Sequence, residues 1–210
     1  MTRILIVDDH AVVRDGVKRI FEAQHGETAF GEASTAQEAA ELVRAENWDV
    51  VILDISLGGR SGLELIKELK QIRPRLPVLI LSMHSEEQYA RRAFKAGAAG
   101  YVTKDNSRAE LVKAVSKVIA GGRYVSAGLA EKLVFDLERG SDRPRHQLLS
   151  DREFEVMRLI ASGKTVGQIA EELSLSDKTI STYRARILEK MGMKTNAEII
   201  HYAIKNKLVE

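Results

Sequence analysis

Four apolar runs of strand length, each followed closely by polar or charged side chains, constrain the fold of this chain more than any other feature. The runs and the residues after them are 4–7 with Asp8 and Asp9, 50–53 with Asp54, 78–81 with Ser82, and 100–102 with Lys104. In an open parallel sheet, ligands bind outside the carboxyl ends of the strands, where the strand order reverses. We therefore expect three carboxylates, one hydroxyl and one ammonium group to meet in one cleft.

The first 120 residues alternate between such runs and amphipathic segments with apolar residues at helical spacing. Strands are expected near residues 3–7, 28–33, 49–53, 77–81 and 99–103. This alternation predicts βαβ units and a parallel sheet, and hence an α/β fold. Five strands with intervening helices favour the flavodoxin-like strand order 2-1-3-4-5, in which the first and third strands are neighbours.

A change of pattern divides the chain into two domains. Residues 1–122 form the α/β part. Residues 123–147 contain one expected helix, at 127–137, and then a polar stretch with Gly and Pro that we interpret as an exposed linker. Residues 148–210 have short helical patterns without strands between them, which predicts a small all-α domain of four helices.

Composition narrows the class of protein. Hydrophobic residues make up 44% of the 210 residues, and cysteine is absent, which excludes disulfides, thiolate zinc sites and cysteine nucleophiles. The apolar runs are far shorter than the roughly 20 residues that cross a bilayer. The first residues also lack the pattern of a secretory signal. We expect a cytoplasmic protein without membrane contact.

The expected cleft has an unfavourable charge balance. Two like charges about 4 Å apart repel by roughly 4 kcal/mol at an effective dielectric constant near 20, so three carboxylates require a cation or raised pKa values. Oxygen ligands without sulfur favour a hard cation that retains waters, which indicates Mg²⁺. Lys104 would supply the fixed positive charge. The combination predicts a phosphorylation site built around a metal ion.

These residues resemble the receiver domain of bacterial response regulators over residues 3 to about 120: paired acids, a central Asp, a hydroxyl, an aromatic and a Lys follow in the expected order. The resemblance implies that Asp54 accepts a phosphoryl group. It also implies Asp9 and Asp54 as Mg²⁺ ligands beside the Ser56 backbone carbonyl, with Asp8 acting through water.

The same resemblance implies a conformational switch that responds to phosphorylation. Ser82 and Lys104 would contact the phosphoryl group, and movement of the Ser82 hydroxyl toward it would let Tyr101 turn inward. This is a shift between two packings of one domain. Ser56 and His84 stand at positions where the family tunes dephosphorylation.

The second domain has the pattern of two helices joined by a tight turn, residues 165–173 and 176–190. This is the helix-turn-helix arrangement, whose second helix enters the major groove of DNA. Residues 176–207 carry seven Lys and Arg against three acids, a net charge of +4, which favours nucleic acid as partner. The residues expected to contact DNA are Lys178, Thr179, Ser181, Thr182, Arg184, Ala185, Arg186 and Lys190.

Residues 148 to about 208 resemble the LuxR-type helix-turn-helix of NarL/FixJ regulators. The matching residues are Leu149 to Glu153, Ile169, Ala170, Leu173, Ser176, Lys178 to Ile180, Met191 and Gly192. The resemblance implies that Ser181, Thr182 and Ala185 face bases and that the last helix, 195–206, is a dimer face.

Together the two resemblances imply a transcription regulator of a two-component system. A cognate sensor histidine kinase would donate the phosphate, and the phosphorylated homodimer would bind double-stranded DNA at paired half-sites about one helical turn apart. Its only catalysis would be its own phosphoryl transfer and slow autodephosphorylation.

Two alternatives stay open. One is a Mg²⁺-dependent phosphatase that uses Asp54, although Ser56 stands where haloacid-dehalogenase chemistry needs a second acid. The other is a phosphorylation-independent interaction scaffold, against which the intact acids and Lys104 argue.

Overall fold

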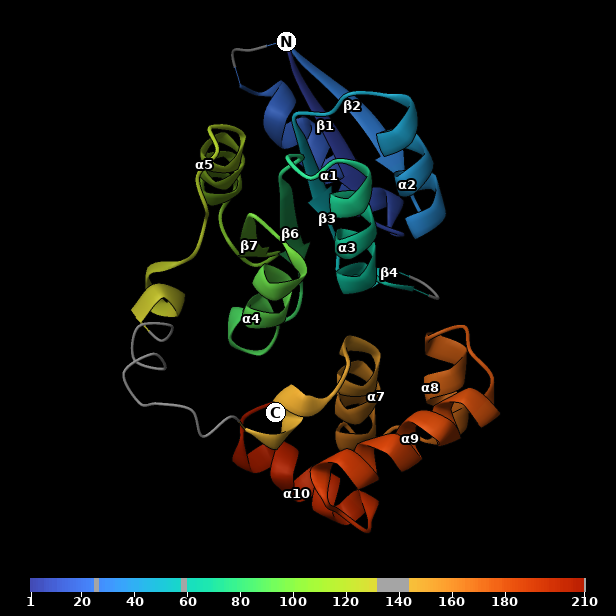
Figure 1. Ribbon diagram of the computed structural model, residues 1–210. Helices are drawn as coiled ribbons and strands as arrows, with labels where there is room; N and C mark the ends of the chain where they lie inside the picture. Colours follow the sequence, from blue (N-terminus) through green and yellow to red (C-terminus); the bar gives the residue numbers. More distant parts are fainter. Residues whose placement is uncertain (25–26, 58–59, 132–143, 210) are drawn as a thin grey trace. The chain divides into compact units, whose positions relative to one another are not determined.

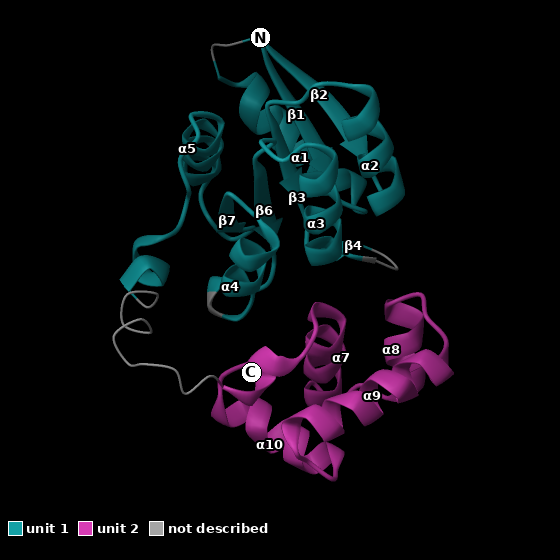
Figure 2. Cartoon of the chain, in the orientation of Figure 1, with its two compact units in different colours: residues 1–138 teal, residues 139–210 magenta. Residues whose placement is uncertain are grey.

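The computed structural model describes residues 1–24, 27–57, 60–131 and 144–209. The chain divides into two compact units, residues 1–138 and 139–210 (Figure 2). Each unit buries apolar residues of its own.

Among the described residues of the first unit, five parallel strands form the central sheet (Figure 1). The strands are β1 (Thr2–Val7), β2 (Thr28–Ala33), β3 (Val50–Leu53), β6 (Val78–Ser82) and β7 (Gly100–Thr103). Their order is β2-β1-β3-β6-β7, which confirms the flavodoxin-like order predicted from the sequence. Val7 lies opposite Leu53 in the register, so Asp8 and Asp54 follow at adjacent strand ends.

Helices cover both faces of this sheet. They are α1 (Ala11–Glu22), α2 (Ala36–Ala45), α3 (Gly62–Ile72), α4 (Glu86–Ala96) and α5 (Arg108–Ile119). Helices α1 and α5 pack on one face through a shared apolar core, and α2, α3 and α4 lie side by side on the other. All four residues of β3 are buried, which explains why this strand is a continuous apolar run rather than an alternating one.

A short antiparallel pair that the sequence did not reveal follows Asp54. It consists of β4 (Ser56–Leu57) and β5 (Arg60–Ser61). Directly after it, the Gly62 N–H donates to the Ile55 carbonyl at 2.8 Å. A Cβ at Gly62 would lie 2.4 Å from the Asp54 carbonyl oxygen, so the approach of α3 to this loop requires glycine.

The segment expected as a linker, 123–147, begins inside the first unit. Tyr124 is 3% exposed and pairs with Gly100 of β7. Residues 127–131 are helical. Residues 132–143, with the rest of the expected helix and most of the expected exposed linker, lie outside the described residues.

The described residues of the second unit are helical or form turns, as predicted. The elements are a 3₁₀ helix η1 (Arg145–Leu148), α7 (Asp151–Ala161), α8 (Val166–Glu172), α9 (Asp177–Met191) and α10 (Asn196–Lys205). Between α8 and α9 the chain turns tightly: Ser174 has a left-handed φ of 52°, and the Leu175 N–H donates to the Ala170 carbonyl at 2.8 Å. This geometry is the predicted helix-turn-helix. The inner faces supply the core, including Phe154, Met157, Ile169, Ile180, Ile187 and Ile199.

Across the described part of the chain, each helix is too short or too polar to cross a lipid bilayer.

Candidate functional site

The carboxyl ends of β1, β3 and β7 bring one ammonium group into contact with two carboxylates. Lys104 Nζ donates to Asp8 Oδ2 at 2.7 Å and to Asp54 Oδ2 at 2.8 Å. The aspartate side chains are 4% and 6% exposed, and the lysine side chain is 13% exposed. Residues that are 96 and 50 positions apart in sequence thus form ion pairs that are almost out of water.

Burial and charge act against each other in this cluster. Burial raises the pKa of Asp54 and the nearby charge of Asp8 adds to this, although the hydrogen bond from Lys104 acts to lower it. Burial acts to lower the pKa of Lys104, but the hydrogen bonds and charges of Asp54 and Asp8 outweigh it, so this pKa is raised. The lysine is therefore held charged, and one positive charge faces two acids.

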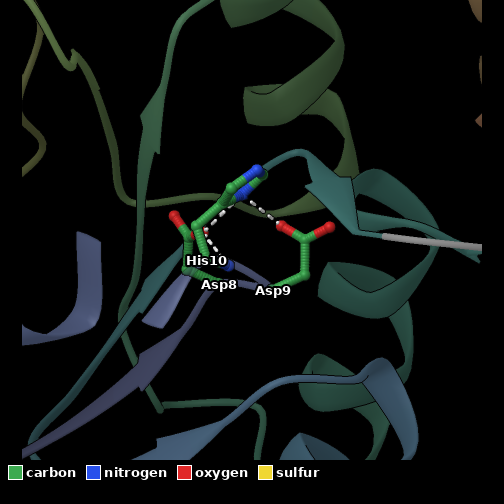
Figure 3. Close-up of side chains that lie close together, drawn as sticks. All are labelled: Asp8, Asp9 and His10. Carbon is green, nitrogen blue, oxygen red and sulfur yellow. Dashed lines mark hydrogen bonds and ion pairs between the residues drawn. The ribbon is translucent and has the colours of Figure 1, made fainter. Parts of the chain in front are cut away.

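Asp9 is exposed and adds a second carboxylate beside Asp8; Figure 3 shows both with His10. The His10 ring lies between the two neighbouring carboxylates, with Nδ1 2.7 Å from Asp9 Oδ1 and 3.3 Å from Asp8 Oδ1. The His10 backbone N–H also donates to Asp8 Oδ1 at 2.9 Å. Sequence reasoning missed His10, whose one signal is its place directly after the paired acids.

The donor set fits a hard divalent cation. Ligand atoms of Asp8, Asp9 and His10 lie within 4.8 Å of one another. The Ser56 N–H donates to Asp54 Oδ1 at 3.3 Å, which places the Ser56 backbone beside the central acid. Carboxylate and carbonyl oxygens are the ligands that Mg²⁺ prefers. Lys104 and His10 contact the carboxylate oxygens of Asp8, Asp9 and Asp54 in this structure, so an ion bound to these oxygens would compete with both residues.

A second group of hydrogen bonds links the site to the start of α4. The His84 N–H donates to Ser82 Oγ at 3.3 Å, and the Tyr101 hydroxyl donates to the His84 carbonyl at 2.8 Å. His84 Nε2 is 3.1 Å from Ser56 Oγ, and its ring stacks on Tyr89 with 4.7 Å between centroids. One residue, His84, therefore contacts the loop after Asp54, the hydroxyl at the end of β6, and the aromatic of β7.

The Tyr101 side chain is turned inward in this structure, with 0% exposure. The resemblance implies that this inward position goes with phosphorylation, and this role of Tyr101 stays a prediction. Burial raises the pKa of Tyr101 far above its usual value, so the hydroxyl stays a neutral donor to the His84 carbonyl.

The outer face of α9 presents small and basic side chains. Ile180, Ile187 and Met191 form its buried stripe, as predicted. Six of the residues expected to contact DNA are exposed: Lys178, Ser181, Thr182, Ala185, Arg186 and Lys190. Small residues let the helix backbone approach base edges, and the cations suit phosphates.

Three of the expected DNA contacts, Lys190, Arg184 and Thr179, also bind residues within the unit through their side chains. Lys190 Nζ binds Glu153 at 2.9 and 2.7 Å, and this glutamate side chain is 3% exposed. Arg184 Nε donates to Asn196 Oδ1 at 2.6 Å, and Thr179 Oγ1 is 2.8 Å from the N-cap hydroxyl of α9. Their roles in this structure are to fix α9 against α7, against α10 and at its own first turn.

Two family models match the chain, one on each unit. The response regulator receiver domain matches residues 4–116, and the bacterial regulatory proteins of the luxR family match residues 147–203.

Curated relatives match over nearly the whole length. Response regulator UvrY of Escherichia coli K12 is 34% identical over 209 residues, covering 99% of this chain and 96% of the relative. Response regulator GacA of Pseudomonas aeruginosa PAO1 is 34% identical over 212 residues, covering 100% of this chain and 99% of the relative.

Solved structures give the same result. RcsB of Salmonella typhimurium, 25% identical, superposes with a TM-score of 0.70 and covers 96% of both chains. RcsB of Salmonella enterica serovar Typhimurium bound to promoter P1flhDC in the presence of phosphomimetic BeF3⁻, 26% identical, has a TM-score of 0.60 with 96% and 97% covered. A LuxR-family two-component response regulator from Aurantimonas sp. SI85-9A1, 38% identical, has a TM-score of 0.60 and covers 65% of this chain and 98% of that one.

Proposed function

The chain belongs to the DNA-binding response regulators that join a receiver domain to a LuxR-type domain, and from this premise we propose that phosphorylation of Asp54 controls its binding to DNA. A phosphatase is not favoured, because hydrolysis would leave the helix-turn-helix unit without a part in the reaction.

The proposed reaction transfers a phosphoryl group from a phosphohistidine of a cognate sensor histidine kinase. A carboxylate oxygen of Asp54 attacks phosphorus and forms a P–O bond, while the P–N bond breaks and its electron pair leaves with the imidazole. Such a transfer needs in-line positioning and charge neutralisation more than covalent help. Lys104 and Ser82 would contact the phosphoryl oxygens. Mg²⁺ bound by Asp9, Asp54 and the Ser56 carbonyl, with Asp8 acting through water, would supply further neutralising charge.

One observation carries this proposal: Lys104 Nζ contacts both Asp8 and Asp54 within 2.8 Å, and all three side chains are largely buried. A buried ammonium group that faces two carboxylates is poised to bind the oxygens of a group added to one of them. An unphosphorylated scaffold has no need of this arrangement, since replacing buried ion pairs by apolar residues is often neutral or stabilising.

For the output, we propose that α9 enters the major groove of double-stranded DNA. Ser181, Thr182 and Ala185 would face bases, and Lys178 and Arg186 would contact phosphates, which is supported by the exposure of all five. Phosphorylation would favour a homodimer that binds paired half-sites. Because DNA and a kinase are its proposed partners, we place the protein in the cytoplasm.

The experiment is labelling of the full chain with acetyl phosphate and Mg²⁺, followed by intact mass measurement. We expect one phosphoryl group on the wild-type protein and none on Asp54→Asn. Asp15→Asn, which changes an exposed aspartate of α1, should be labelled like the wild type. Labelling that persists in Asp54→Asn would overturn Asp54 as acceptor, and DNA affinity that is equal before and after labelling would overturn the control of DNA binding.

A further inference from the structure

The segment that follows α5 contacts both the proposed switch residue and the first turn of α4. Strand β7 lies at one edge of the sheet. Along this edge the Tyr124 N–H donates to the Ala99 carbonyl at 2.9 Å, and the Tyr124 carbonyl accepts from the Tyr101 N–H at 3.3 Å. A Cβ at Gly100 would lie 2.9 Å from the Tyr124 Cβ, so this close approach depends on glycine. The backbone of Tyr101 is thus bonded directly to the segment that leads out of the first unit.

Tyr124 is a fixed anchor for this segment. Its ring is 3% exposed within the core that α1 and α5 share. Its hydroxyl donates to Glu110, and Lys117 Nζ lies 6.0 Å from the ring centroid. Contacts on the ring, the hydroxyl and the backbone together hold the segment where it leaves α5.

Two residues further on, the segment is tied to α4. Ser126 Oγ donates to Glu86 Oε2, and Glu86 is the first residue of α4. The same hydroxyl accepts from the Leu129 N–H at 3.2 Å, so it also caps the helical turn at residues 127–131. The yellow turn after α5 in Figure 1 is this helical part. One hydrogen bond therefore joins the start of α4 to the start of the outgoing helix.

The carboxylate of Glu86 makes this contact through one of its two oxygens. The other oxygen, Oε1, has no hydrogen-bond partner among the described residues. A hollow of about 320 Å³ borders the contact and is lined by Ser85, Thr103, Asn106 and Gly128, among others. The first turn of α4 therefore has room to move.

A short series of hydrogen bonds connects the residues around Asp54 to the contact between Glu86 and Ser126. Ser82 Oγ accepts from the His84 N–H, and the His84 carbonyl accepts from the Tyr101 hydroxyl. Glu86 follows His84 by two residues. If the Ser82 hydroxyl moves toward a phosphoryl group on Asp54, the His84 N–H loses this acceptor, and one of the bonds that hold the backbone leading into α4 is broken.

We propose that Glu86 and Ser126 form a latch between α4 and residues 126–131, and that phosphorylation of Asp54 opens it. When the latch opens, residues 126–131 are no longer bonded to α4. The chain that leads to the DNA-binding unit is then held less tightly by the receiver unit, which is a shift between two packings. The latch rests on the proposed function, because it names the route by which the phosphorylated site acts on the rest of the chain.

The test is amide hydrogen exchange of the full chain, read in peptides that cover residues 126–131, before and after acetyl phosphate with Mg²⁺. Glu86→Ala removes the latch but leaves the Ser126 cap of the outgoing helix in place. We expect it to raise exchange about fivefold without phosphate, the ratio that corresponds to the roughly 1 kcal/mol net contribution of one hydrogen bond. Wild type should reach a similar rate only after phosphorylation.

Two variants serve as controls. Glu64→Ala changes a half-buried glutamate in the first turn of α3 and should exchange like wild type in this segment. Glu86→Gln keeps an amide oxygen that accepts from Ser126 and should restore most of the protection. Peptides from β1 report whether any variant has lost the fold.

The latch is overturned if Glu86→Ala leaves the exchange of the segment within about twofold of wild type. It is also overturned if phosphorylated wild-type protein exchanges no faster there than unmodified protein. Intact mass is measured on the same samples, so a chain that takes up no phosphoryl group overturns the proposed function, and this result is separate from the exchange of unmodified Glu86→Ala.

Discussion

Replacing Lys104 with methionine tests the charge balance of the cleft directly, because it removes the ammonium group and keeps a side chain of similar length. Nζ lies 2.7 Å from Asp8 Oδ2 and 2.8 Å from Asp54 Oδ2. At an effective dielectric constant near 20, each contact corresponds to roughly 6 kcal/mol of attraction. Much of this is offset by the cost of taking three charges out of water.

The measurable loss is smaller than the gross attraction. Breaking a buried ion pair by removal of one partner costs about 3–5 kcal/mol, because a charge is left buried without compensation. The Lys104 side chain is 13% exposed, so some water reaches the site. We therefore expect Lys104→Met to lower the free energy of unfolding of the first unit by about 3 kcal/mol in EDTA.

Added Mg²⁺ should recover more stability in Lys104→Met than in wild type, because no ammonium group competes for the carboxylates. Free ion at a hundred times its dissociation constant stabilises by roughly 2.7 kcal/mol. Urea unfolding with EDTA and with Mg²⁺ measures both effects. Lys113→Met, at an exposed position of α5, is the matched control. A loss under about 1 kcal/mol in EDTA, or an equal Mg²⁺ response in both proteins, would refute the reasoning.

Three further predictions concern single side chains. Burial acts to raise the pKa of Glu153, but Lys190 and Ser150 hold it below its usual value. This stability is present above the unfolded pKa of 4.5 and is lost as pH falls through the folded pKa, so Glu153→Gln should flatten thermal unfolding of the second unit against pH in that range. Tyr101→Phe removes one hydrogen bond to backbone and should cost about 1 kcal/mol in urea unfolding while Asp54 labelling persists. Arg186→Ala should reduce the salt slope of DNA binding by about one, whereas Lys190→Ala should leave the slope unchanged and destabilise the second unit. A slope that falls equally in both would contradict the Glu153 contact as the main role of Lys190.

The cleft could be predicted from the sequence because its geometry follows from local patterns. A continuous apolar run specifies a strand buried on both faces, and parallel strands with crossover helices end at the same edge of the sheet. Asp8, Asp54 and Lys104 are therefore brought together by strand order alone. Their contacts in the structure need no special long-range signal.

Other contacts form between residues that are far apart in the sequence, and local sequence patterns do not predict such pairs. The sequence predicts Lys190 as a solvent-facing cation of a DNA-binding helix. Its side chain is 41% exposed, but it also binds a buried glutamate 37 residues earlier, which the sequence did not reveal. Tyr124 comes two residues after Gly121 and Gly122, at the start of the predicted linker segment. It nevertheless pairs with β7, because Gly100 leaves space for it. In both cases the deciding residue lies far away in sequence, so the residues around Lys190 or Tyr124 do not identify it.

The charge argument for the cleft yields a last prediction. If Lys104→Met is unstable because Asp8 and Asp54 lose a shared counter-charge, then removing one of the two carboxylates should relieve most of the loss. Asp54→Asn in the Lys104→Met background should recover about 1–2 kcal/mol in EDTA, although Asp54→Asn alone removes a contact from wild-type Lys104. The two substitutions should thus be strongly non-additive in urea unfolding, as expected for residues that share a contact. Additive losses would mean that the unpaired charge is not the cause, and that Lys104 stabilises the cleft by packing.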